Sequence, residues 1–414
     1  MGRKAYFIMI LTKESEIRKI RYLFMLTYMV SYITRINYGA VILEIGSNTG
    51  FAQELLSLAL TGSFLTYGVG QLISGYFGDK VQPKKLVLLG LSVTVLMNIL
   101  IPLCNHPLQM AAVWCVNGFA QAFMWPPIVR LMVNLLSERV YKRETVFVSW
   151  GSSIGTILIY LLSPLLISIA GWRAVFVMSA VSGVLMILVW YRICPILEDE
   201  KKTKKEEMEV KGKFSFLRSP LLIGIMFAIV LQGSLRDGVT TWMPTYISET
   251  YQFSNGTSIL TGVLLPIFSI LSYELTLKFY RKQPYNPLFC AGWIFLLGSM
   301  SAVALLLFTG NNAAVCIFCM ALLTGCMHGV NLILICMVPA FFKESGKVSL
   351  VSGVLNSCTY VGSAISTYGI AKISKQAGWN FTITLWIFIA AAGAFICFVA
   401  IPAWKKKITE QSQR

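Results

Sequence analysis

Long apolar segments alternate with short polar loops along the whole chain. The apolar segments cover residues 20–42, 56–78, 84–103, 109–136, 145–169 and 173–193, and then 220–247, 257–279, 286–308, 313–341, 348–371 and 379–402. Each has about the 20 residues that an α-helix needs to cross a lipid bilayer. The pattern therefore predicts an all-α membrane protein with twelve transmembrane helices, arranged as six plus six.

A charged segment separates the sixth and seventh predicted helices. It reads PILEDEKKTKKEEMEVKGKFSF, and this mixture of lysine and glutamate cannot enter hydrocarbon. We therefore expect an N-terminal six-helix half at residues 1–194, a charged cytoplasmic linker at 195–218 and a C-terminal six-helix half at 219–414.

The two halves resemble one another in sequence. SWGSSIGTI followed by Gly171-Trp172 matches NSCTYVGSAI followed by Gly378-Trp379, at a shift of 207 residues. Two arginines inside apolar segments, Arg35 and Arg236, lie 201 residues apart. Two pseudo-symmetric repeats of six helices, with substrate held between them near the bilayer midplane, are the architecture of major facilitator transporters.

Composition and charge agree with a membrane protein. Hydrophobic residues make up 56% of the chain and charged residues 13%, a balance that excludes a water-soluble fold. The net charge of +17 does not indicate a nucleic-acid partner, because the basic residues sit between apolar segments and not on one face. They gather at both ends of the chain, in the linker and in alternate loops. By the positive-inside rule, both termini of this multi-pass protein of the cell membrane are cytoplasmic.

Arg35 and Arg236 are the strongest indication of function. An arginine at the centre of a membrane helix costs about 2.5 to 3.5 kcal/mol on insertion scales, so a compensating partner is expected. The repeat places the two at equivalent positions, facing each other across a central cavity. Two guanidinium groups there suit a phosphate or a carboxylate. The alternative is that each arginine snorkels or binds backbone carbonyls.

Three further polar residues lie inside apolar segments. Asp237 follows Arg236 at about 100° around a helix, so both cannot point straight at one ligand. It could reduce the charge of the arginine, take a proton or pair with another polar group. His328 could line the cavity and titrate, or pack as a neutral side chain. Glu274, four residues before Lys278, predicts an ion pair and a candidate gate at the cytoplasmic end.

The sequence GYFGDKVQPKKL, between the second and third helices, resembles the cytoplasmic loop signature of major facilitators. In that signature the aspartate acts with helix ends and basic residues as a latch between halves. The resemblance implies gating roles for Asp79, Lys80 and Arg130. The equivalent second-half loop, FYRKQPYNP, has Tyr280 where the aspartate would stand, so no matching second latch is expected.

Over nearly its whole length the chain resembles the organophosphate:phosphate antiporter family. The matching stretches are YITRINYGA, NGFAQAFMWPPIVRLMVN, SLRDGVTTWMPTYISE and the Gly-Trp pair after the fifth helix. The resemblance places Arg35 and Arg236 on the two family arginines that hold the substrate phosphate. It suggests these further candidates nearby: Tyr32, Asn37, Tyr38, Trp125 and Asn134.

The chain departs from the family where selectivity should lie. Gln71 stands where the family has a lysine, and Ser152 where it has a histidine. The two arginines are then less supported against a phosphate dianion. We expect a substrate that is less charged, larger, or hydrogen-bonded through Gln71 and Ser152.

The sequence thus predicts a secondary transporter and not an enzyme. Its expected partners are the bilayer, a small organic anion and either inorganic phosphate, exchanged by alternating access, or a proton. The alternatives are a proton-coupled symporter of a carboxylate or sugar acid, and a non-transporting sugar-phosphate sensor. The cysteines lie mostly singly in apolar segments, and no cofactor or metal is expected. We expect a monomer.

Overall fold

The computed structural model describes residues 11–78, 80–195, 219–253, 261, 264–282, 286–343 and 346–412. The predicted linker, apart from its first residue, and Asp79 lie outside these described residues. In the N-terminal half the helices are α1 (Glu14–Thr49), α2 (Gln53–Gly78), α3 (Pro83–Leu100) with η1 (Ile101–Leu103), α4 (Pro107–Gln121), α5 (Trp125–Leu135), α6 (Glu138–Ala170) and α7 (Trp172–Ile193). In the C-terminal half they are α8 (Pro220–Tyr251), α10 (Leu264–Lys282), α11 (Pro287–Phe308), α12 (Ala313–Asn331), η3 (Leu332–Met337), η4 (Val338–Phe342), α13 (Val348–Val399) and α14 (Ile401–Ser412).

These helices confirm the predicted all-α architecture. Each apolar segment coincides with one helix, with a pair of consecutive helices or with one part of α13. The fourth segment is broken into α4 and α5, and the tenth continues from α12 through a π-helical and a 3₁₀ turn. Several helices begin with proline, whose fixed backbone angle suits the first helical turn.

By length and composition alone, eight segments among the described residues are long and apolar enough to cross a membrane. The remaining predicted spans include segments that are interrupted or polar. α4 and α5 have only 15 and 11 residues because the helix breaks between them. α10 carries Glu274, Lys278, Arg281 and Lys282 within its 19 residues. A polar helix is expected where it faces water or protein and not lipid.

The repeat seen in the sequence is also present in the backbone. Gly171, which ends α6, has φ 74° and ψ 175°, and Gly378, inside α13, has φ 79° and ψ 175°. Residues other than glycine rarely adopt such a positive φ. The kink at Gly378 divides α13 into two membrane-crossing parts, as Gly171 separates α6 from α7. The same residue therefore makes the same turn in both halves.

A second pair of glycines sets how the arginine-bearing helices pack. A Cβ atom on Gly155 of α6 would lie 2.5 Å from the carbonyl oxygen of Met29 in α1. On Gly362 of α13 it would lie 2.0 Å from the carbonyl oxygen of Val230 in α8. Met29 and Val230 each precede their arginine by six residues. α6 therefore packs on α1 as α13 packs on α8.

We expect Gly362→Ala to destabilise the protein, because the added methyl group collides with backbone and overpacking typically costs about 1 to 3 kcal/mol. Gly369→Ala in the same helix is the matched control, since a Cβ there meets no atom within 4 Å. Thermal unfolding in detergent should show a midpoint lowered by several degrees for Gly362→Ala only. Equal midpoints for the two variants would contradict the proposed packing.

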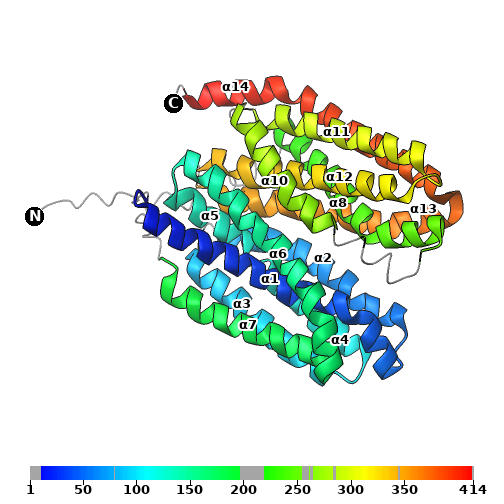
Figure 1. The fold of residues 1–414 in the computed structure, drawn as a ribbon. Coiled ribbons are helices and arrows are strands. Elements are labelled where there is room, and N and C mark those ends of the chain that lie inside the picture. Colours follow the sequence, from blue (N-terminus) through cyan, green and yellow to red (C-terminus); the bar gives the residue numbers. More distant parts are fainter. Residues whose placement is uncertain are drawn as a thin grey trace, which may run out of the picture.

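The two halves lie side by side, and the start of α1 and the end of α14 lie at the same side of the bundle (Figure 1). We call this side the terminal end. The predicted cytoplasmic location of both termini requires such an arrangement, although which membrane face it occupies stays a prediction.

At the terminal end, α2 and α13 approach closely between the halves. A Cβ on Gly75 would lie 2.9 Å from the carbonyl oxygen of Ser349 and 3.1 Å from the Cα of Gly353. Nearer the middle, Ser357 donates a hydrogen bond of 2.9 Å to the carbonyl of Gly68. Only glycine allows the two backbones to pack this tightly.

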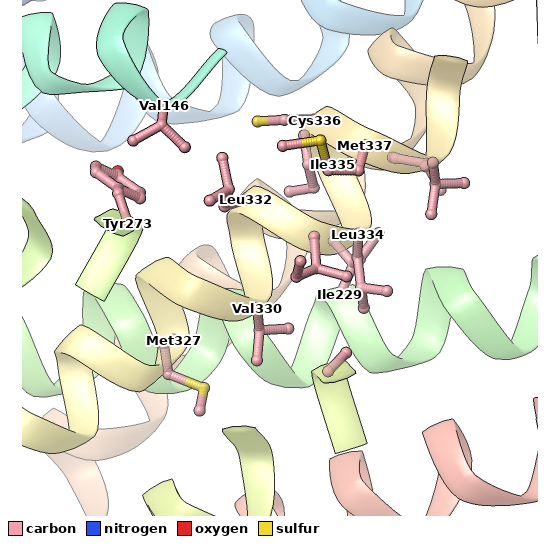
Figure 2. Close-up of a cluster of buried hydrophobic side chains, with 14 of the residues drawn as sticks. Val146, Ile229, Tyr273, Met327, Val330, Leu332, Leu334, Ile335, Cys336 and Met337 are labelled. Atoms are coloured by element: carbon pink, nitrogen blue, oxygen red, sulfur yellow. The ribbon is translucent and has the colours of Figure 1, made fainter. Parts of the chain in front are cut away.

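α6 makes the second contact between the halves. The hydroxyl groups of Ser153 and Ser269 lie 2.6 Å apart, joining α6 to α10. At the terminal end the Tyr141 hydroxyl donates to the carbonyl of Cys336 in η3. Figure 2 shows Val146 of α6 facing the buried apolar cluster around η3. Among the described residues, these contacts close the bundle from the terminal end to its middle.

Candidate functional site

Arg35 lies on α1, among the aromatic rings of three helices. Its guanidinium carbon is 4.2 Å from the ring centre of Tyr32 and 4.8 Å from that of Tyr67 on α2. Its Nη1 is 3.5 Å from the hydroxyl of Tyr360 on α13. Ring faces stabilise a cation without neutralising it, and a 3.5 Å hydrogen bond is at the limit of its range. In the described residues Arg35 thus has no acidic partner.

Arg236 lies on α8 and has a different environment. Its Nε and Nη2 donate to the two carboxylate oxygens of Asp237 at 2.7 and 2.8 Å, and the side chains are 13% and 28% exposed. Ser363 of α13 donates to the same carboxylate at 2.5 Å. Although neighbouring residues diverge by about 100° on a helix, the long arginine side chain folds back and reaches the carboxylate. Of the roles left open for Asp237, the structure shows pairing with Arg236.

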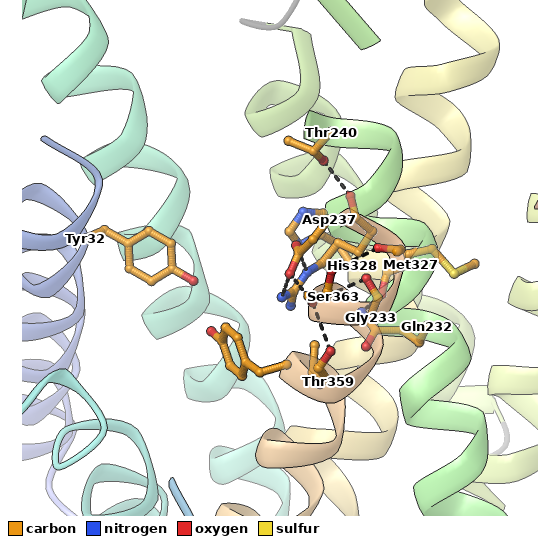
Figure 3. Close-up of polar contacts among 12 residues, drawn as sticks. Tyr32, Gln232, Gly233, Asp237, Thr240, Met327, His328, Thr359 and Ser363 are labelled. Atoms are coloured by element: carbon orange, nitrogen blue, oxygen red, sulfur yellow. Dashed lines mark hydrogen bonds and ion pairs between the residues drawn. The ribbon is translucent and has the colours of Figure 1, made fainter. Parts of the chain in front are cut away.

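The two arginines share one space between the halves. Tyr360 of α13 lies within hydrogen-bond range of Arg35, and Ser363, one turn further along the same helix, holds the carboxylate that is paired with Arg236. Figure 3 shows Tyr32 on the N-terminal half facing the group that contains Asp237, His328 and Ser363 on the C-terminal half. His328 of α12 hydrogen-bonds Tyr273 of α10 at 3.1 Å through its Nδ1. The site therefore combines charged, hydroxyl and aromatic groups from both halves.

The structure does not bring Asn37 and Tyr38 to this site. Asn37 is fully buried and donates to Asn98 at 2.7 Å and to Ser179 at 3.0 Å, which ties α1 to α3 and α7. Tyr38 is also fully buried, stacks on Trp114 and donates to a backbone carbonyl of α2. Both residues are of types that often bind substrate, but here they pack inside the N-terminal half. We assign them structural roles.

Gln71 and Ser152, the two positions of departure from the family, are also buried. Gln71 is 0% exposed; its amide nitrogen lies 3.4 Å from the carbonyl of Ala122, and its amide oxygen has no partner among the described residues. Ser152 donates to the carbonyl of Ser149 in its own helix. Both side chains are buried in this conformation, and their predicted hydrogen bonds to substrate stay a prediction.

Trp125 and Asn134 belong to α5. Trp125 supports the site from behind, because its ring packs on Tyr28 with centroids 4.7 Å apart, and Tyr28 packs on Tyr32 at 5.1 Å. Asn134 donates to the carbonyl of Arg130, one turn earlier in the helix. Two rings, those of Tyr28 and Tyr32, thus separate Trp125 from the guanidinium of Arg35.

The candidate gating residues occupy the terminal end. Arg130 donates to the carbonyls of Gly78 and Val81 at 2.6 and 3.1 Å, so it holds the loop after α2 within the N-terminal half. Lys80 lies over the ring of Tyr76, 3.8 Å from its centre. Glu274 forms no ion pair with Lys278 in the part of the chain that the structure describes, contrary to the expectation from their spacing.

Sequence reasoning did not single out the tyrosines and serine that complete the site. The missed residues are Tyr28, Tyr67, Tyr273, Tyr360 and Ser363. One signal was available for two of them: Tyr360 and Ser363 lie one turn apart in NSCTYVGSAI, a stretch marked by the internal repeat. Among the described residues, no group of three acidic, histidine or cysteine side chains is placed to hold a metal ion.

Two six-helix repeats with a charged site between them define a membrane transporter of the alternating-access type. This chain belongs to the Major Facilitator Superfamily, whose profile matches residues 24–367. It is a transport protein and not an enzyme.

Known relatives confirm the resemblance to the organophosphate group. The chain is 24% identical to a "Probable hexose phosphate transport protein" of Chlamydia muridarum, over 94% of this chain and 90% of that one. It is 23% identical to the "Membrane sensor protein UhpC" of Salmonella typhimurium, over 89% and 87%. It is 26% identical to the "Glycerol-3-phosphate transporter" of Bacillus subtilis, over 64% and 66%. Among solved structures, the human organic anion transporter MFSD10 has the same fold, with a TM-score of 0.74 at 15% identity over 94% of this chain and 100% of that one.

Proposed function

We propose that this protein carries a small phosphorylated metabolite across the cell membrane in exchange for inorganic phosphate. The observation that carries the proposal is that Arg35 and Arg236, one from each half, are both joined to one turn of α13, Arg35 through Tyr360 and Arg236 through Asp237 and Ser363. A phosphate group can accept hydrogen bonds from both guanidinium groups at once. The names of the relatives, which include hexose phosphate and glycerol-3-phosphate transporters, support the same substrate class.

The mechanism follows from where the halves touch. The contacts of α2 with α13 and of α6 with η3 close the terminal end, so substrate would enter this conformation from the opposite side. An anion that bridges Arg35 and Arg236 draws the halves together there and partly neutralises the buried positive charge. The contacts at the terminal end would then open. The protein then changes conformation more readily with substrate bound than when it is empty, which favours exchange over uptake alone.

Two other functions are supported by specific observations. The similarity to a membrane sensor protein favours a receptor that binds a sugar phosphate without transporting it. The Asp237 carboxylate within the site favours a proton-coupled symporter of a carboxylate, because such a group can carry the proton.

A ligand screen separates these possibilities. Purified protein in detergent is heated with hexose phosphates, glycerol 3-phosphate, inorganic phosphate and sugar acids, and its unfolding temperature is measured. A ligand at 100 times its Kd stabilises by about 2.7 kcal/mol, which is easily detected. We expect phosphate esters and inorganic phosphate to raise the unfolding temperature of the protein. The same ligands should support counterflow in proteoliposomes. Stabilisation by sugar acids alone would contradict the proposal, and binding without counterflow would indicate a sensor.

A further inference from the structure

We infer that Asp237 is a fixed counter-ion of the binding site, and that it selects phosphate groups carrying a single negative charge. This inference rests on the proposed function and specifies its substrate class. The Asp237 carboxylate is already paired with Arg236, one of the two arginines of the site. The substrate therefore meets a site with less positive charge than two arginines imply.

The geometry leaves Arg236 able to bind a ligand while it remains paired. A guanidinium has five N–H donors in a planar fork. Asp237 uses the Nε donor and one Nη2 donor. Among the described residues both Nη1 donors and the second Nη2 donor remain, and one N–H of each nitrogen points along the other bidentate edge of the fork. A phosphate can bind that edge without displacing the carboxylate, which Ser363 also holds in place.

Besides Arg236 and Asp237, the ionisable side chains of the site come from five helices. α1 contributes Arg35 and Tyr32, α2 Tyr67, α10 Tyr273, α12 His328 and α13 Tyr360. With tyrosines and histidine neutral, the formal charge of these groups, Arg236 and Asp237 sums to +1. Arg35 supplies that charge, because in the described residues it has only ring faces and one distant hydroxyl as partners.

A site of this charge favours a monoanion over a dianion. One negative charge on the substrate neutralises the site. A second charge would lie within one guanidinium width of the Asp237 carboxylate, and like charges at short distance in a partly buried site repel strongly. The expected substrate head is therefore a protonated phosphate monoester or a phosphodiester, exchanged for the monoanion of inorganic phosphate.

The test compares two probes of the same skeleton, glycerol 3-phosphate and its methyl diester. The monoester loses a proton near a second pKa of about 6, so its monoanionic fraction falls from about three quarters at pH 5.5 to about one thirtieth at pH 7.5. The diester keeps one charge throughout. Kd is measured by titration calorimetry at both pH values for the wild type, for Asp237→Asn, and for Glu249→Gln. Glu249 is an exposed carboxylate of the same helix, about 18 Å further along it.

In the wild type we expect monoester affinity to fall about twentyfold between the two pH values while diester affinity stays constant. Asp237→Asn, which keeps the shape and removes the charge, should abolish that fall and strengthen monoester binding at least about tenfold at pH 7.5. Glu249→Gln should behave as the wild type.

Three results would overturn the inference: monoester binding that does not change with pH in the wild type, an unchanged fall in Asp237→Asn, or an equal fall for both probes. The last would assign the pH response to His328 or another protein group. Failure of every phosphate ester to bind in the thermal screen is a different outcome, and it contradicts the proposed function itself.

Discussion

Replacing Arg35 or Arg236 by lysine is expected to leave the protein folded and to reduce exchange at least about tenfold. Lysine keeps the positive charge but has no planar fork, so it cannot make two parallel hydrogen bonds to one phosphate. At Arg236 it also cannot hold both oxygens of Asp237, which the native side chain does at 2.7 and 2.8 Å. Counterflow in proteoliposomes measures the effect.

The matched control for these variants is Arg173→Lys. Arg173 is an exposed arginine at the start of α7 that donates to the carbonyl of Pro102, remote from both halves' shared space. Its exchange activity should match the wild type, and the expression and unfolding temperature of all variants should agree within a few degrees. Full exchange in either Arg35→Lys or Arg236→Lys would show that the arginine is structural.

Gly353→Val should abolish exchange by preventing closure of the terminal end. A Cβ on Gly353 would lie 2.3 Å from the carbonyl oxygen of Gln71 and 2.8 Å from the Cα of Gly75. These are backbone atoms of α2 in the other half, so the clash is relieved by separating the halves and not by moving a side chain. Each half can retain its own packing. We expect exchange to fall to less than about a tenth, while the conformation that is open at the terminal end still binds substrate.

Gly369→Val in the same helix serves as the control for that variant, because nothing lies within 4 Å of a Cβ there. Both substitutions place a β-branched residue in a helix, so propensity effects cancel. If Gly353→Val exchanged as well as Gly369→Val, the contact of α2 with α13 would not be a required closed state of the transport cycle.

The positions of Arg35 and Arg236 could be predicted because a charge inside an apolar helix is costly and the internal repeat relates the two. The same repeat paired Gly171 with Gly378, and the backbone angles of these two glycines agree. Such features are encoded locally, by residue type and spacing. They needed no knowledge of how the helices rotate against one another.

The remaining site residues depend on that rotation. Tyr32 and Tyr38 lie about 60° to either side of Arg35 around α1, and the sequence alone does not say which side faces the cavity. The structure turns Tyr32 toward the site and Tyr38 into the interior beside Trp114. The pairing of Arg236 with Asp237 was likewise hidden, because it depends on a side-chain rotamer and on Ser363 from a distant helix.

The central claim is that Arg35 and Arg236 hold one anion together, and a double-mutant cycle tests it most directly. Kd for the most strongly stabilising phosphate ester is measured for the wild type, Arg35→Ala, Arg236→Ala and the double variant. Each single change should weaken binding at least about tenfold, since a charge-assisted hydrogen bond contributes about 1.5 to 3 kcal/mol. Because both residues bind the same ligand, the double variant should lose less than the sum of the single losses. Strictly additive losses, or unchanged binding in either single variant, would contradict a shared site.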